Sequence, residues 1–308
     1  MKKIILLTLL SLTFVYGQSV KVLTVEKINK DTNENYYHPH FSGNDTKIIV
    51  TKSNYKGLYA IDLENKNTET ITEELGAGYK PLILPESETI IFKSFVVKNG
   101  LKYNSLKSVD IAKKKIETIE SEQRNLSLPN QLRTNKIFYL NNRKVEQADS
   151  PVNTLAKTNK ENKAVFIKNN SLYLIENGET IELNPLGKGV YVWSSLSNDG
   201  SKIVFSFANK GTYVCDIKGN ILLNIKDAHY PKFSPDAQYI SYMIDKDNGD
   251  YFTSSDLYIY SLKENKSYKI TDTNDKIEMY ADWSHNGKQI VYQTTEGEIY
   301  LMKLDIKN

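Results

Sequence analysis

The stretch Pro231-Lys232-Phe233-Ser234-Pro235-Asp236-Ala237, followed by Ile240-Ser241-Tyr242, decides the fold because it recurs along the chain. The clear copies place an aromatic or leucine residue before Ser, then a turn rich in Asn, Asp, Pro or Gly, then a β-branched and aromatic run. This pattern predicts a strand, a tight turn and a returning strand. Six copies are present, and they begin at Pro39, Pro81, Leu128, Ser194, Pro231 and Ala281, those at Pro81 and Leu128 being weaker.

A third and a fourth strand-like run follow most copies. Residues 57–63 and 257–260 are third runs, and residues 69–72 and 268–271 are fourth runs that end in Ile-Thr. Helical patterns are nearly absent, and residues 115–119 alternate as an outer strand would. Four antiparallel strands per repeat form a meander blade, so the sequence predicts an all-β fold consisting of a single β-propeller.

The six copies, taken as innermost strands, predict a six-bladed propeller of four-stranded antiparallel blades. These blades begin near residues 37, 79, 126, 190, 229 and 279. The third blade is overlong, because residues 126–187 contain two returning runs, at 136–140 and 164–167. A seventh, stunted blade is the alternative, with Asn153-Thr154-Leu155-Ala156 as its degraded innermost strand.

The last blade ends without a fourth strand, and residues 20–28 form a lone strand-like run before the first blade. We expect this N-terminal strand to pair with the C-terminal blade and to close the ring, because closure removes two open sheet edges.

The repeated motif also carries a family resemblance. Phe-Ser-Pro-Asp at 233–236, with Trp-Ser-His-Asn-Gly at 283–287 and Leu-Ser-Asn-Asp-Gly at 196–200, resembles the WD40-like (PD40) repeat of TolB-type six-bladed propellers. The resemblance covers nearly the whole chain beyond residue 17. It implies a protein-interaction module of the envelope, and it indicates fold more strongly than activity, because this repeat serves many roles.

The N-terminus has the composition of a secretory signal peptide: Lys2 and Lys3, an apolar run of about 13 residues, and then Gly17. A membrane-spanning helix needs about 20 apolar residues. We therefore expect a signal peptide over residues 1–17, removed near Gly17, and a TolB-like β-propeller over residues 18–308 that is periplasmic or secreted and has no membrane span.

Charge and cysteine content exclude several classes of protein. Without residues 1–17 the chain has 38 basic and 37 acidic residues, a net charge of +1, which gives no electrostatic reason to expect nucleic acid as a partner. The single cysteine, Cys215, cannot form an intramolecular disulfide and lies in a strand-like run. We expect a monomer that needs no cofactor.

Residues just before each motif copy predict a ligand-binding ring at the mouth of the central funnel. They combine flat aromatic faces with polar tips, which suits a sugar or a peptide; the alternative is that some of them only wedge neighbouring blades apart. The ring consists of Tyr36, Tyr37, His38, Tyr79, Lys80, Arg124, Tyr191, Trp193, His229, Tyr230, Glu278 and Tyr280.

Two patterns raise the question of a metal site. His38, His40, His229 and His285 lie at different heights on the predicted strands, so we do not expect them to converge on one ion. Asp245, Asp247 and Asp250 supply alternating carboxylates around Gly249, as in a calcium loop, but without the distal bidentate Glu. The sequence therefore predicts no metal, with these aspartates as weak calcium candidates.

The sequence carries no Gly-x-Ser-x-Gly elbow and no Gly-rich phosphate loop. It therefore favours a noncatalytic binding or scaffolding propeller that engages an envelope or extracellular protein, peptide or glycan at the funnel face, with no catalytic residues. The alternative is a carbohydrate-active enzyme, a lyase or hydrolase, with its site at the aromatic mouth. Acidic and imidazole groups within hydrogen-bond reach at the funnel would favour the enzyme.

Overall fold

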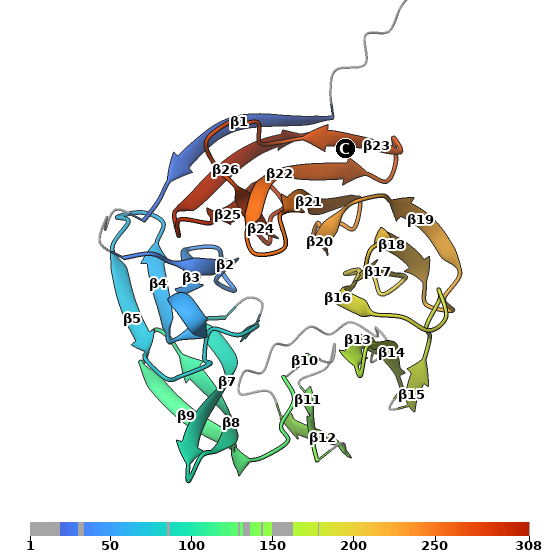
Figure 1. Cartoon of the computed structure of the whole chain (residues 1–308). Coiled ribbons are helices and arrows are strands. Elements are labelled where there is room, and N and C mark those ends of the chain that lie inside the picture. The colour runs from blue at the N-terminus through green and yellow to red at the C-terminus, as the bar shows by residue number, and fades with distance from the viewer. Residues whose placement is uncertain are drawn as a thin grey trace, which may run out of the picture.

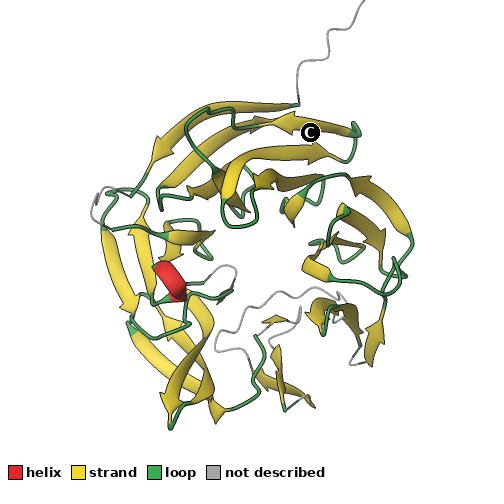
Figure 2. Cartoon of the chain, viewed as in Figure 1, coloured by secondary structure: helices red, strands yellow, loops and turns green. Residues whose placement is uncertain are grey.

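The computed structural model describes residues 19–29, 34–84, 87–128, 130–131, 136–142, 144–149, 163–177 and 179–307. In these residues almost all regular structure is β-strand, and the one helical element is the short 3₁₀ turn η1 (Ser53–Tyr55) (Figure 2). The signal-peptide prediction for residues 1–17 lies outside the described residues. No helix in the described part of the chain is long and apolar enough to cross a membrane.

The strands form antiparallel sheets arranged around a common centre (Figure 1). The sheets are numbered here as blades in chain order. Blade 1 comprises β2 (Tyr37–Phe41), β3 (Lys47–Thr51), β4 (Leu58–Asp62) and β5 (Thr68–Thr72), and blade 2 comprises β6 (Leu82–Ile83), β7 (Thr89–Lys98), β8 (Leu101–Asp110) and β9 (Lys115–Gln123).

Blades 3 and 4 have three described strands each. Blade 3 comprises β10 (Asn130–Gln131), β11 (Lys136–Asn141) and β12 (Lys144–Asp149), and blade 4 comprises β13 (Lys163–Lys168), β14 (Ser171–Glu176) and β15 (Glu179–Glu182).

Blades 5 and 6 are again four-stranded meanders. They comprise β16 (Tyr191–Leu196), β17 (Lys202–Phe207), β18 (Gly211–Asp216) and β19 (Ile221–Ile225), and then β20 (His229–Phe233), β21 (Tyr239–Asp247), β22 (Phe252–Ser261) and β23 (Lys266–Lys269). Blade 7 combines both ends of the chain: β24 (Glu278–Trp283), β25 (Gln289–Thr294), β26 (Ile299–Ile306) and β1 (Val20–Lys27).

The all-β propeller prediction is confirmed, and the described strands form seven sheets. Six of these sheets each contain one of the six motif copies. Blade 4 carries no described motif copy and lies inside the stretch predicted as an overlong third blade, which is the arrangement that the seven-blade alternative describes. The innermost strand expected for that blade, residues 153–156, lies outside the described residues.

Hydrophobic clusters between neighbouring blades form the core. Successive residues of each second strand face opposite blades, as the two-residue period of a strand requires. Ile48 packs toward blade 7 and Ile49 toward blade 2, and in the same way Val204 faces blade 6 while Phe205 faces blade 4. The described residues contain one such cluster at each of the seven blade interfaces.

The N-terminal strand closes the ring, as the sequence predicted. β1 pairs antiparallel with β26 from Val20 opposite Ile306 to Lys27 opposite Tyr300, with one irregularity after Val22. The backbone N–H of Lys307 also donates to the carbonyl of Ser19 at 2.9 Å. β1 therefore supplies the outer strand of blade 7 and satisfies the backbone groups of β26 (Figure 1).

Closure can be tested with a matched pair of substitutions in β1. Val20 is 1% exposed and belongs to the cluster between blades 6 and 7, whereas Leu23 is 54% exposed. Val20→Asp places an unpaired carboxylate in an apolar cluster, so we expect a loss of several kcal/mol in unfolding free energy, on the order of 3. Leu23→Asp is the control and should change stability by less than about 0.5 kcal/mol. Equal denaturation midpoints for the two variants would contradict closure.

Candidate functional site

The first strands of four blades share an irregularity at one position. The register of β2, β16, β20 and β24 against the second strand is interrupted in the middle of each first strand. At each interruption a bulky residue adopts a left-handed backbone conformation: His38 and Trp193 at φ 52°, Tyr230 at 52° and Tyr280 at 58°. Such a conformation costs a non-glycine residue on the order of 1–3 kcal/mol, and structures retain it mainly at functional sites.

The bulge decides which predicted mouth residues reach the centre. In a regular strand, residues two apart share a face, but here the residue two positions before each bulge lies in the core instead. Tyr36, Tyr191 and Glu278 are at most 4% exposed. Tyr36 packs against Tyr59, and Tyr191 against Phe205 and Phe207. The prediction that these three residues line the mouth is therefore wrong.

The bulge residues instead join into one chain of aromatic rings, which we name the aromatic arc. Ring centroids lie 4.8 Å apart between His38 and Tyr55, 4.9 Å between His38 and Tyr280, and 4.8 Å between Tyr280 and Tyr230. The arc continues over 5.9 Å to Trp193 at one end and over 4.8 Å from Tyr55 to Tyr79 at the other. It consists of Tyr79, Tyr55, His38, Tyr280, Tyr230 and Trp193.

The other predicted mouth residues have separate positions. His229 lies at the Trp193 end of the arc, and its Nδ1 is 2.6 Å from an oxygen of Asp245. This hydrogen bond raises the pKa of His229. Arg124 lies over the ring of Tyr103, at 5.5 Å, and Tyr37 is half-buried opposite Thr51.

A central cavity of about 600 Å³ adjoins the arc, and Lys80 and Trp193 line it. Five of its other wall residues occupy one position of the repeated motif, the residue before the Phe, Leu or Trp that precedes Ser or its equivalent. This position is occupied by His40, Ile83, Ser195, Lys232 and Asp282, all of which line the cavity. The alternation of the strand explains the placement, because the following Phe or Trp faces the core.

Three charged or ionisable groups meet on the wall that blades 1, 6 and 7 provide. Lys232 Nζ lies 2.5 Å from Asp282 Oδ1, and His40 Nδ1 lies 3.4 Å from Asp282 Oδ2. The backbone N–H of Phe41 also donates to Asp282 Oδ2 at 3.1 Å. Burial alone would raise the pKa of Asp282, but the charge of Lys232 and the hydrogen bonds hold it well below its usual range.

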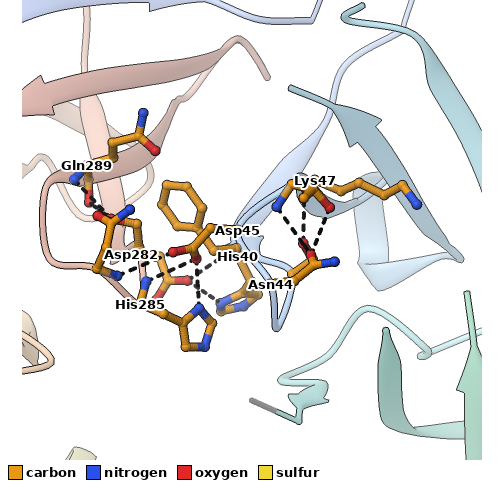
Figure 3. Close-up of polar contacts among 12 residues, drawn as sticks. His40, Asn44, Asp45, Lys47, Asp282, His285 and Gln289 are labelled. Atoms are coloured by element: carbon orange, nitrogen blue, oxygen red, sulfur yellow. Dashed lines mark hydrogen bonds and ion pairs between the residues drawn. The ribbon is translucent and has the colours of Figure 1, made fainter. Parts of the chain in front are cut away.

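A second histidine–aspartate pair joins the same two blades in the opposite direction. His285, from blade 7, places Nδ1 2.7 Å from Asp45 Oδ1, in blade 1, and its backbone N–H donates to the same oxygen at 3.0 Å. Figure 3 shows both pairs, with the His40 and His285 rings on the same side of the joint between the blades. Each carboxylate orients an imidazole that lines the cavity.

Lys80 differs from Lys232 although both line the cavity. Lys80 reaches the solvent of the cavity, but the surrounding walls partly desolvate its ammonium group and lower its pKa, and repulsion from Lys232 adds to this effect. In Lys232, the charge of Asp282 outweighs burial and raises the pKa. Lys232 therefore stays cationic, whereas Lys80 loses its proton more readily than an ordinary lysine.

His38 and Tyr280 keep the arc uncharged near neutral pH. Burial, followed by the charges of His40, Lys232 and Lys80, lowers the pKa of His38 to about 4. Burial raises the pKa of Tyr280 to about 12. Both side chains are therefore neutral between about pH 5 and pH 11.

The three aspartates considered as calcium ligands do not converge on one point. Asp245 faces His229, Asp247 accepts from the N–H of Gly249 at 2.8 Å, and Asp250 lies in the exposed hairpin tip. Within the described residues no group of three or more His, Cys, Asp or Glu side chains is placed to hold a metal ion. Cys215 is buried, and burial raises the pKa of its thiol to about 12, unlike that of a nucleophile.

No family model matches the sequence, and no curated protein matches it. An oligogalacturonate lyase from Vibrio parahaemolyticus is similar in structure over 87% of this chain and 78% of its own, with 11% sequence identity and a TM-score of 0.48. An oligogalacturonate lyase in complex with manganese is similar over 88% of this chain and 77% of its own, with 13% sequence identity and a TM-score of 0.48. Likeness at these scores does not establish activity.

The expectation of a noncatalytic binding or scaffolding propeller is corrected. Amine, carboxylate and imidazole groups meet within 2.5–3.4 Å on the cavity wall, which is the arrangement set above as the mark of an enzyme. The sequence interpretation missed Lys232, Asp282 and Tyr55, although the first two lie within the quoted motif copies.

The Asp282 pairing makes an acid-stability prediction. A carboxyl whose pKa is lowered by folding stabilises the native state above its unfolded pKa, and this contribution is lost as pH falls through the lowered folded value. Stability should therefore fall below about pH 4, near the ordinary value of 3.8. Asp282→Asn should be less stable at pH 7 and should lose less on acidification, as measured by urea midpoints at pH 7 and pH 3. Asp250→Asn, at an exposed position, is the control. Equal acid losses in wild type and Asp282→Asn would contradict the prediction.

Proposed function

We propose that this propeller is a carbohydrate-active enzyme, specifically a lyase that cleaves an acidic saccharide by β-elimination in the central cavity. The observation that carries the proposal is the opposite displacement of two lysine pKa values in one cavity: that of Lys80 is lowered and that of Lys232 is raised. Pairs of groups whose environments push their pKa values apart are typical of acid–base catalysis.

Each cavity group has one step in the proposed reaction. The neutral amine of Lys80 removes the proton from the carbon that bears the substrate carboxylate. The electrons of that C–H bond form a carbon–carbon double bond, and the bond from the next carbon to the glycosidic oxygen breaks. Lys232, held cationic by Asp282, stabilises the negative charge that develops on the carboxylate. The imidazole of His40, oriented by Asp282, gives a proton to the leaving oxygen.

Hydrolysis fits the cavity less well. Glycoside hydrolases generally use two carboxyl groups, one of which must carry a proton. Among the described residues that line the cavity, Asp282 is the one acidic side chain. Its pKa is held low, so it stays ionised and cannot supply the proton. Elimination from a uronate can use an amine as the base and a fixed positive charge beside the carboxylate, and the cavity provides both.

The direct test incubates the protein with oligogalacturonates and with alginate oligosaccharides, and follows the ultraviolet absorbance of the double bond that elimination creates. We expect Lys80→Met to lower kcat by about 10²–10⁴-fold, the usual contribution of a general base. The rising limb of the wild-type kcat/KM profile should report the pKa of Lys80, below the ordinary 10.5 of lysine, because the neutral amine is the active form.

The matched control is Lys246→Met, which removes a lysine from the exposed end of β21 and should leave kcat unchanged. Thermal melting of both variants checks that the fold is intact. The proposal is overturned if none of these uronate oligosaccharides gives the double bond, or if folded Lys80→Met retains the wild-type rate.

A further inference from the structure

We propose that the aromatic arc is an extended saccharide-binding platform, which holds the non-reacting sugar units of an oligomeric substrate beside the cavity. This inference rests on the proposed function for its ligand class. It goes beyond that function because it assigns a second set of binding positions, on different residues, and predicts a dependence on chain length.

Backbone conformation is the first observation that supports the platform. Tyr55, like the four bulge residues, has positive φ, at 57°. Five of the six arc residues, from four different blades and one turn, therefore hold a bulky side chain in a conformation that such residues rarely adopt. Ring packing alone does not require this conformation, since Tyr36 and Tyr191 pack in the core without it. Repeated strain of this kind indicates a function for the side chains that it positions.

The chemistry of the arc selects the ligand. All six of its side chains are at least partly exposed, Tyr79 the most at 39%. Their apolar rings and the tyrosine hydroxyl groups together suit a molecule with both apolar and hydroxyl-bearing faces. The arc carries no charge near neutral pH, because His38 and Tyr280 are both neutral there. The cavity instead holds a cation, Lys232, which Asp282 keeps protonated. The cavity therefore fits the reacting uronate, and the arc fits sugar rings through their faces.

Continuity between the two regions places them on one ligand. Trp193 and Lys80 line the cavity, Trp193 is also the end of the arc, and Lys80 lies 5.8 Å from the ring of Tyr79 at the other end. His38, in the middle of the arc, is close enough to His40, Lys232 and Lys80 for their charges to lower its pKa. A chain that reaches the cavity from this side must therefore pass along the arc.

The test measures binding in the Lys80→Met background, so that substrate is not consumed, by titration calorimetry with galacturonate dimer and pentamer. We expect the pentamer to bind more tightly than the dimer. Trp193→Gly should weaken pentamer binding by about tenfold, the scale of one aromatic contact, and should weaken dimer binding less. The difference between pentamer and dimer should be constant from pH 5 to pH 9.

Glycine is chosen because it adopts the left-handed conformation without strain, so Trp193→Gly should keep its melting temperature if the ring serves a ligand. A large drop in melting temperature would show that Trp193 is a structural wedge and would overturn the inference. Tyr251→Ala is the matched control, since Tyr251 is 75% exposed at the tip of the β21–β22 hairpin. It should change neither affinity.

The outcomes separate the inference from the proposed function. If the wild type forms product but Trp193→Gly weakens dimer and pentamer equally, the lyase stands and the platform fails. If the wild type forms no product but pentamer binding depends on Trp193, the platform stands and the lyase fails. If neither oligomer binds, the platform is overturned for this ligand class.

Discussion

The backbone bulge in the innermost strands is the constraint on which the centre of this propeller depends. A regular strand would turn the residue at the bulge to the same side as the residue two positions earlier. The interruption separates the two, so that Glu278 stays in the core while Tyr280 joins the arc. The same separation holds between Tyr36 and His38. One local departure from strand geometry, repeated in four blades, thus places one residue in the core and the residue two positions later in the aromatic arc.

Apolar packing between blades fixes the position of each blade around the centre. Each second strand presents successive apolar residues to its two neighbours, so every blade is held from both sides. Closure by β1 places blade 7 under the same condition and brings Asp282 beside His40 of blade 1. The proposed catalytic contacts between blades 1 and 7 therefore lie at an edge of the one blade that both ends of the chain build.

Much of this architecture could be predicted from the sequence, and the parts that could not be predicted have physical reasons. Alternating runs and turn residues gave the blades, and the lone run at 20–28 gave the closure, because both follow from local periodicity. Blade 4 was harder to count, since none of its described strands carries the motif. The arc was only partly predicted, because Tyr36, Tyr191 and Glu278 lie only two residues before His38, Trp193 and Tyr280, and a regular strand would turn both members of each pair to one face. Nothing in residue type reveals a bulge that depends on the pairing of two strands.

The position before the motif aromatic carries His40, Lys232 and Asp282, three of the four groups in the proposed reaction, whereas Lys80 lies outside it. Around the ring it is His40, Ile83, Ser195, Lys232 and Asp282, so the ionisable groups fall in blades 1, 6 and 7 and the apolar residue in blade 2. The strand period sends each of these side chains toward the cavity, whatever its type. The fold therefore fixes the direction in which the side chain at this position points, but not which residue occupies the position. Because the charged members are adjacent in the closed ring, Asp282 can bind Lys232 and His40 at once, and the three groups together form one wall of the cavity.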